Sequence, residues 1–173
     1  MAQATKTSRA LQEVVDAGFP KDNGRVEAIF LRPQTEKREE RQEAMLTAAE
    51  GVRGDRWQTK DPRTQITLMS ATVLDRVSDG DRSRWALAGD QLIVDLDLSE
   101  ENLPIGQRLQ VGAVILEMTE VPHTGCVKFK GRYGTEALDF ISAPERASLR
   151  LRGAYAKVLQ DGTVRVGDAI AKL

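Results

Sequence analysis

The segment from Val121 to Gly134 combines the chain's single cysteine and single histidine with three basic side chains, Lys128, Lys130 and Arg132. Nearby positive charge favours a thiolate over a thiol, and the thiolate is the form that attacks as a nucleophile or binds a soft metal. Cys126 is therefore the first candidate for a nucleophile, a sulfur carrier or a metal ligand.

Other roles for these residues have to be weighed. An isolated cysteine is commonly a small buried hydrophobe, but a Pro-x-x-Gly-Cys turn followed by Lys128 and Lys130 is a poor place to bury one, so we favour a functional Cys126. His123 either orients or protonates a group near Cys126 or only hydrogen-bonds within its loop. A structural zinc site needs four ligands, and a Cys/His acyl-transfer site needs an orienting residue that the sequence does not identify, so both are weaker readings.

A second segment, from Gly51 to Trp57, places two glycines, two arginines and an aspartate in one short loop. Such a loop can present backbone amides and guanidinium groups to an anion. Asp55 in this loop and Asn102 further on can each cap a turn instead of touching a ligand. Each cation taken alone is most simply a solvated surface charge. The cations that can converge on a phosphate are Arg53, Arg56, Lys128, Lys130, Arg132, Arg150 and Arg152.

The overall composition restricts the class of protein. A chain of 173 residues with 40% hydrophobic content is expected to form one domain. The 25 basic and 26 acidic residues nearly cancel, which argues against a nonspecific nucleic-acid binder. One cysteine forms no internal disulfide, and the polar start carries no secretory signal, so we expect a cytoplasmic location. Without a long uncharged apolar run, no membrane span is expected.

Hydrophobic spacing and turn residues predict the elements that position these segments. A short helix is expected over 7–17 with Ser8 as N-cap, and a strand from Gly24 to Pro33 with Val26, Ala28 and Phe30 on its core face. Residues 34–42 are predicted as a charged loop or the outer part of a hairpin, and 44–49 as its return strand. Further predictions are a strand at 65–69, a helix capped by Ser70, one or two strands at 92–98 and helical turns within 133–141.

Two glycine-centred segments, 109–115 and 164–170, each read as strand, tight turn and strand. Asp161-Gly162 predicts a hairpin joining strands at 154–159 and 163–166. Many short strands with glycine corners indicate a mainly β protein, a barrel or a sandwich, with a few short helices.

From about Gly24 to Ile170 the chain resembles the MOSC domain, the module at the C-terminus of molybdenum cofactor sulfurases that also occurs alone. No single match is specific, but several matching pieces occur in the same order over almost the whole chain. The matching pieces are Gly24-Arg25-Val26-Glu27-Ala28-Ile29, Gly51-Val52-Arg53-Gly54-Asp55-Arg56, Glu101-Asn102-Leu103, Ile105-Gly106-Gln107-Arg108-Leu109-Gln110-Val111-Gly112, Pro122-His123-Thr124-Gly125-Cys126, and Leu151 to Val158 with Gly162 to Asp168.

The resemblance implies a MOSC-like β-barrel over residues 23–173, preceded by an N-terminal appendage at 1–22. It implies that Cys126 carries a persulfide or ligates molybdenum. The pterin phosphate of the molybdenum cofactor (molybdopterin) is then expected to meet arginine and lysine side chains. The cofactor-binding residues expected on this basis are Arg53, Asp55, Arg56, Asn102, His123, Thr124, Lys128 and Arg152.

Pro-His-Thr-Gly-Cys followed by Lys-Phe looks most like the small stand-alone branch related to bacterial reductases of N-hydroxylated compounds. A reductase of a small molecule is therefore expected, supplied by an external electron donor because no flavin or iron–sulfur motif is present. The alternatives are a carrier that delivers sulfur or the cofactor to a sulfur-transfer partner, and a non-catalytic module for phosphorylated ligands. The family commonly has histidine where this chain has Trp57, so no role of that histidine is transferred.

Overall fold

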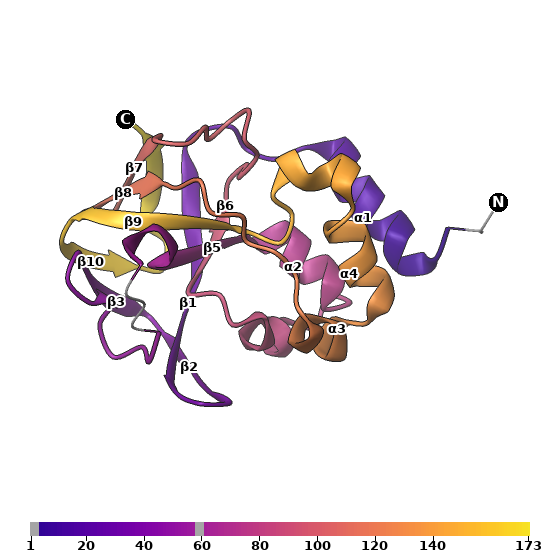
Figure 1. Ribbon diagram of the computed structural model, residues 1–173, viewed down its shortest axis with the longest axis horizontal. Coiled ribbons are helices and arrows are strands. Elements are labelled where there is room, and N and C mark those ends of the chain that lie inside the picture. The colour runs from indigo at the N-terminus through magenta and orange to yellow at the C-terminus, as the bar shows by residue number, and fades with distance from the viewer. Residues whose placement is uncertain (1–3, 58–60) are drawn as a thin grey trace.

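The computed structural model describes residues 4–57 and 61–173. Strands close into a barrel, and short helices cover one side of it (Figure 1). In the described chain the barrel has, in spatial order, β1 (Gly24–Gln34), β11 (Ala169–Lys172), β7 (Arg108–Val111), β8 (Val114–Met118), β9 (Ala154–Gln160), β5 (Ile66–Ser70) and β6 (Leu92–Asp95), which pairs with β1 again. β5 and β6 run parallel, and the other barrel pairs are antiparallel. The predicted mainly β barrel is confirmed.

The first barrel strand is buried on both faces, which differs from the predicted single core face. The register of β1 against β6 shifts between Val26 and Ala28. Side chains alternate along a strand, so a one-residue shift moves the following residues to the opposite face. Val26 therefore points into the barrel with Ile29, whereas Ala28 and Phe30 face the helices.

The charged segment after β1 forms a hairpin. β2 (Lys37–Arg41) returns along β1, so the outer-hairpin reading of 34–42 is confirmed. The return-strand reading of 44–49 is wrong, because β3 (Glu43–Thr47) leaves the barrel and pairs with β4 (Gly51–Val52) and β10 (Gly162–Arg165) in a second small sheet.

The hairpin predicted across Gln160-Asp161-Gly162 is also wrong, since β10 pairs with β3 and not with β9. Asp161 accepts a hydrogen bond from the amide of Ala48 at 2.8 Å, which ties this corner to the small sheet. Gly162 packs so close to the β7–β8 turn that a Cβ there would lie 2.8 Å from the Ala113 carbonyl oxygen. Tertiary contacts with β3 therefore override the local Asp-Gly preference.

The two glycine-centred segments also have different outcomes. β7 and β8 form the expected hairpin around Gly112. β10 and β11 flank Gly167 but join different sheets, because β10 follows β3 while β11 closes the barrel between β7 and β1.

Helices form the second layer on the right of Figure 1. The first is capped by Thr5, which accepts from the Ser8 amide, so Ser8 lies inside the helix instead of capping it. Ser70 caps the second as predicted. The helices are α1 (Lys6–Ala17), α2 (Ala71–Val77), α3 (Val127–Tyr133) and α4 (Thr135–Ile141), with the 3₁₀ segments η1 (Pro62–Thr64), η2 (Arg82–Ala88) and η3 (Pro144–Leu149).

Two hydrophobic cores result, one inside the barrel and one between the barrel wall and the helices. Leu11 and Val14 of α1 are buried in the second core with Phe129 of α3. The division into 1–22 and 23–173 stays a prediction, and residues 1–3 lie outside the described part. No helix within the described ranges is both long enough and apolar enough to cross a membrane.

Candidate functional site

Cys126 lies at the end of the loop that leads from β8 to α3, in extended backbone just before the helix begins. Its side chain is exposed, and within the described chain it makes no capping hydrogen bond. Gly125 fixes the approach of this loop to α4, because a methyl group at this position would lie 2.2 Å from Leu138 Cδ1. The loop therefore presents the sulfur outward while its backbone packs tightly against a helix.

A buried ion pair lies behind the cysteine loop. Arg152, two residues before β9, donates from Nη1 to Asp90 Oδ2 at 2.7 Å and from Nη2 to the Ala88 carbonyl at 3.2 Å. Its guanidinium also lies 4.9 Å from the ring centre of Phe129 on α3. Asp90 lies two residues before β6, so this pair connects the barrel wall to the helix that follows Cys126.

His123 packs beside this pair. Its Nδ1 is 3.5 Å from Asp90 Oδ1, and its ring centre is 4.5 Å from that of Tyr155. Burial is the largest influence and lowers the pKa of His123 to about 4, with Asp90 opposing the shift and Arg152 adding to it. The imidazole is therefore neutral near pH 7.

This network leaves hydrogen-bonding capacity unused. Asp90 Oδ1, His123 Nδ1 and Arg152 Nε are buried and have no hydrogen-bond partner among the residues the structure describes. Buried polar atoms are nearly always paired, so unpaired ones call for an explanation such as a bound ligand or water. The location predicted for the site thus contains groups that can accept further partners.

Four arginines gather near the β1–β2 hairpin and α3. We call Arg32, Arg38, Arg56 and Arg132 the arginine cluster. The pKa of Arg38 is held below its ordinary value, first by burial and next by the charge of Arg132, with Arg32 and Arg56 adding to the effect against Glu36. Arg38 Nε is buried without a hydrogen-bond partner in the described chain. An anion bound here would relieve repulsion between like charges.

The glycine-arginine loop contributes only part of its predicted set to this cluster. Arg56 belongs to it. Asp55 is buried and accepts from the Arg32 amide and side chain and from the Trp57 amide, so its carboxylate holds the loop. Arg53 is exposed, pairs with Glu50 at 3.0 Å, and lines a separate groove near Gly54.

Trp57 is also engaged within the protein. Its indole nitrogen donates to the Thr64 carbonyl at 2.9 Å, and the Arg32 guanidinium lies 5.5 Å from its ring centre. The indole is therefore held by a main-chain carbonyl and by a neighbouring arginine.

The other predicted residues are spread out. Lys128 is exposed and 3.4 Å from Glu36, which also pairs with Arg132 at 3.2 Å. Asn102 is buried, donates to the Asp97 carbonyl at 2.8 Å and accepts from Lys172 at 2.9 Å, so its amide is used in holding its own loop. Thr124 is exposed and lines a cavity together with His123.

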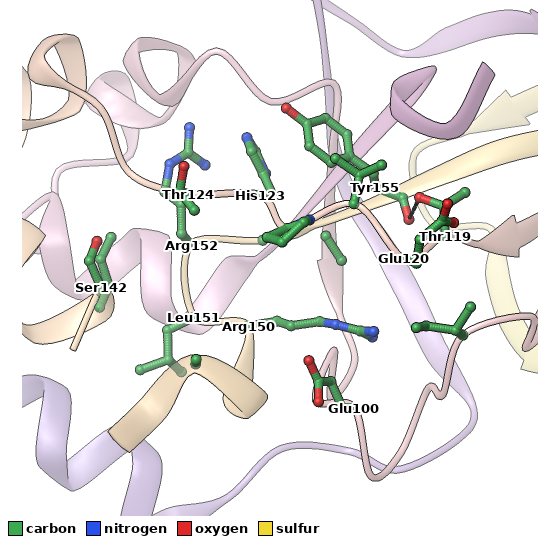
Figure 2. Close-up of a pocket in the computed structure, with 17 residues that line it drawn as sticks. Glu100, Thr119, Glu120, His123, Thr124, Ser142, Arg150, Leu151, Arg152 and Tyr155 are labelled. Carbon is green, nitrogen blue, oxygen red and sulfur yellow. Dashed lines mark hydrogen bonds between the residues drawn. The ribbon is translucent and has the colours of Figure 1, made fainter. Parts of the chain in front are cut away.

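That cavity, of about 220 Å³, lies beneath the cysteine loop. In Figure 2, Arg152, His123 and Tyr155 project to one side of the β9 segment, whereas Arg150 and Glu100 lie on the other. Residues on both sides of this segment line the same cavity, so the cavity borders the buried ion pair as well as Arg150.

Sequence reasoning missed Arg32, Arg38 and Asp90 as parts of the site. Arg38 occurs in a segment so rich in charge that no single arginine stands out. Asp90 offered a clearer signal, because it follows Gly89 and lies two residues before a strand whose first three residues are fully buried. A charge at the edge of such a strand requires a partner.

A model of the MOSC domain matches residues 55–171, so the chain belongs to the MOSC domain family, as the sequence motifs indicated. It is therefore a domain related to the molybdenum cofactor. The match begins after β1 and β2, which carry Arg32 and Arg38. A search of curated proteins finds no match.

Solved structures show the same fold. The YuaD protein from Bacillus subtilis is similar with a TM-score of 0.60 and 14% identity, over 87% of this chain and 95% of that one. YiiM from Escherichia coli gives 0.56 and 16%, over 86% and 69%. YiiM from Geobacillus stearothermophilus gives 0.55 and 12%, over 87% and 75%. Identities this low establish the fold alone.

Proposed function

We propose that this chain binds the molybdenum cofactor through Cys126 and reduces N-hydroxylated small molecules. The observation that carries the proposal is the combination of an exposed cysteine with the arginine cluster, joined through α3. Cys126 immediately precedes α3, and Arg132 on that helix belongs to the cluster. A soft ligand and a phosphate-binding group on one short element suit a metal-pterin phosphate.

The residues present fit this cofactor. A thiolate is a suitable ligand for a soft metal. Guanidinium groups bind phosphate through paired hydrogen bonds, and Arg38 has an unpartnered buried nitrogen among the described residues. Arg38 and Arg56 are therefore better placed for the phosphate than Arg53, which pairs with Glu50, whereas Arg132 of the same cluster shares its charge with Glu36. The remaining predicted ligands stay predictions.

Within this proposal the bound cofactor supplies a redox-active metal. Cys126 holds it at the loop, and the arginine cluster orients its phosphate. Reduction of a hydroxylamine breaks the N–O bond, consumes two electrons and two protons, and releases an amine and water. The electrons come from an external reduced protein. His123 Nδ1 faces Asp90, so the imidazole is positioned to hold a proton on the nitrogen next to this carboxylate.

The test is the molybdenum content of the full chain produced in a host that makes the cofactor. Wild type is expected to carry about one molybdenum per chain and Cys126→Ser less than about a tenth of that. Lys130→Gln is the matched control, because it removes an exposed cation from the same helix outside the arginine cluster. Wild type without molybdenum, although Cys126 is intact and reduced, would overturn the proposal.

A second candidate is a carrier that hands sulfur or the cofactor to another protein. It is favoured by the exposure of Cys126 and by the neighbouring Val127, whose 85% exposure leaves an apolar side chain at the surface. Mass spectrometry of protein isolated with a sulfur donor would show one added sulfur atom on Cys126. That mass shift without turnover of any hydroxylamine selects the carrier, and turnover without it selects the reductase.

A further inference from the structure

The cavity beneath the cysteine loop contains a guanidinium that has no ion-pair partner among the residues the structure describes. Arg150 lines this cavity, and no carboxylate in the described part of the chain lies within 4 Å of its nitrogens. We propose that the cavity binds a ring-sized organic acid, with the acid group on Arg150.

The backbone holds Arg150 in an uncommon conformation. Its φ is 48°, in the left-handed region that non-glycine residues rarely adopt. The Arg150 amide donates to the Ala147 carbonyl at 3.2 Å, and the Gly153 amide donates to the Arg150 carbonyl at 2.9 Å. A conformation of this kind persists where the surroundings enforce it, and such residues concentrate at binding sites.

The side chain is fixed at one nitrogen and open at the others. Nη1 donates to the carbonyls of Leu103 at 2.7 Å and Leu98 at 3.2 Å. Nε and Nη2 make no hydrogen bond with any described residue, so one edge of the fork is available. Burial holds the pKa of Arg150 below its ordinary value, with Glu100 opposing. A carboxylate bonded to the open edge would restore the stabilisation that burial removes.

The walls and the volume set the size of the occupant. The apolar side chains of Val121, Pro122, Ile141 and Leu151 line the cavity, and Ile105 lies at its margin with 64% exposure. The volume is about 220 Å³, whereas an apolar cavity of about 150 Å³ accommodates benzene. A six-membered ring carrying one carboxylate therefore fits the space and the chemistry of the walls.

Two carboxylates also line the cavity and must be considered. Glu120 is paired at 2.8 Å with Arg63, which also pairs with Asp61. Glu100 is exposed and not within ion-pair distance of Arg150, although its charge raises the Arg150 pKa. Glu100 is the lining carboxylate whose charge acts on Arg150, so it would compete with an incoming acid, and its removal should strengthen acid binding.

The same cavity reaches His123 and Thr124 at the cysteine loop. If Cys126 carries the proposed reductase centre, the preferred substrates are N-hydroxylated compounds that also bear an acid group. This statement about substrates rests on the proposed function, whereas acid binding itself does not.

The experiment is calorimetric titration of the full chain with benzoate, with neutral benzamide and cationic benzamidine as comparison ligands. We expect benzoate to bind at least about tenfold more tightly than benzamide, because a charge-assisted pair with Arg150 is absent for the amide. Arg150→Gln is expected to weaken benzoate binding about tenfold, and Glu100→Gln to strengthen it several-fold.

Controls separate a lost contact from a lost fold. Arg146→Gln removes a neighbouring arginine of η3 that does not line the cavity, and should leave the benzoate affinity unchanged. Ala147→Phe fills the rim and should abolish binding, whereas Ala49→Phe, at an exposed position that does not line the cavity, should not. Thermal melting of each variant confirms folding.

Equal affinity for benzoate and benzamide, or unchanged benzoate binding in a folded Arg150→Gln protein, would overturn the proposal. Benzoate binding by a chain that carries no molybdenum supports the acid pocket and counts against the reductase. Molybdenum binding and turnover without benzoate affinity would support the reductase and overturn the acid pocket.

Discussion

Arg150 and Arg152 are two residues apart and point to opposite sides of the same segment, and the protein treats their charges differently (Figure 2). Arg152 is 7% exposed and bonded to the carboxylate of Asp90. Arg150 is half-buried, and within residues 4–57 and 61–173 its side chain bonds only to main-chain carbonyls. A carboxylate neutralises a cation and fixes its position, whereas carbonyl partners fix the position and leave the charge. The Arg152–Asp90 pair therefore stabilises the fold, whereas the uncompensated charge of Arg150 can bind a ligand.

The largest loss of stability is expected when the buried counter-charge of Arg152 is removed. Asp90→Ala leaves Arg152 buried without a counter-charge, and losing one partner of a buried pair costs about 3–5 kcal/mol. Urea unfolding measures the loss. Glu39→Ala, which removes the partner of exposed Arg41, should change the midpoint too little to separate from scatter. Similar midpoints for both variants would mean that Arg152 is not structural.

His123 tests the same network through pH. Its pKa in the folded chain is about 4 against an ordinary 6.5, because burial disfavours the charged ring. Between these pH values the unfolded chain binds a proton that the folded chain does not. The contribution of His123 to the free energy of unfolding is therefore fully present above pH 6.5 and is lost as the pH falls toward 4. The contribution is about 3 kcal/mol.

The measurement is urea unfolding of wild type and His123→Gln at several pH values from 7.5 to 4.5. The variant lacks the titrating ring, so its stability should decline less steeply than that of wild type over this range. Parallel declines would show that the imidazole titrates alike in both states.

Replacing Arg150 should cost less stability than removing Asp90. Arg150→Gln keeps the same backbone conformation and removes two hydrogen bonds to carbonyls, which are worth about 1–2 kcal/mol together. Guanidinium chloride or urea midpoints give the value. A loss as large as that for Asp90→Ala would remove the distinction between the two arginines.

The arginine cluster should show the smallest stability effect, and with the opposite sign. Arg38 is destabilised by burial and by the charge of Arg132, so Arg38→Gln should leave the melting temperature unchanged or raise it. The same substitution should weaken binding of inorganic phosphate about fivefold or more. Arg76→Gln, on the exposed face of α2, serves as the control in both measurements. Unchanged phosphate affinity would remove the cluster from the binding site.

The sequence predicted where helices and strands lie better than it predicted which strands pair. Local patterns located the barrel strands, the Ser70 cap and the β7–β8 hairpin. They failed for β10, because Asp161 is engaged by Ala48 from a distant turn. They also failed along β1, since a bulge has no reliable signature in a run of apolar residues.

The candidate site likewise contains residues that the sequence identifies and residues that only the fold brings together. Cys126 and His123 could be selected because each is unique in the chain and both occur in one loop. Their surroundings could not be selected, since Arg38 on β2 and Asp90 before β6 are far from the cysteine loop in the sequence. Residues shared with a family motif can also serve the fold, and Asp55 and Asn102 both use their side chains for internal hydrogen bonds.

The close contact between Gly125 and Leu138 makes the two positions mutationally dependent. The φ of Gly125 is not in the left-handed region, so an alanine there is opposed by the contact and not by the backbone. Gly125→Ala should be damaging with Leu138 and tolerated when Leu138→Ala removes the obstructing methyl group. The side chain at position 138 of α4 would then determine which residues are tolerated at position 125, directly before the cysteine. Evolution of the cysteine loop would thus depend on a helix that lies outside the site.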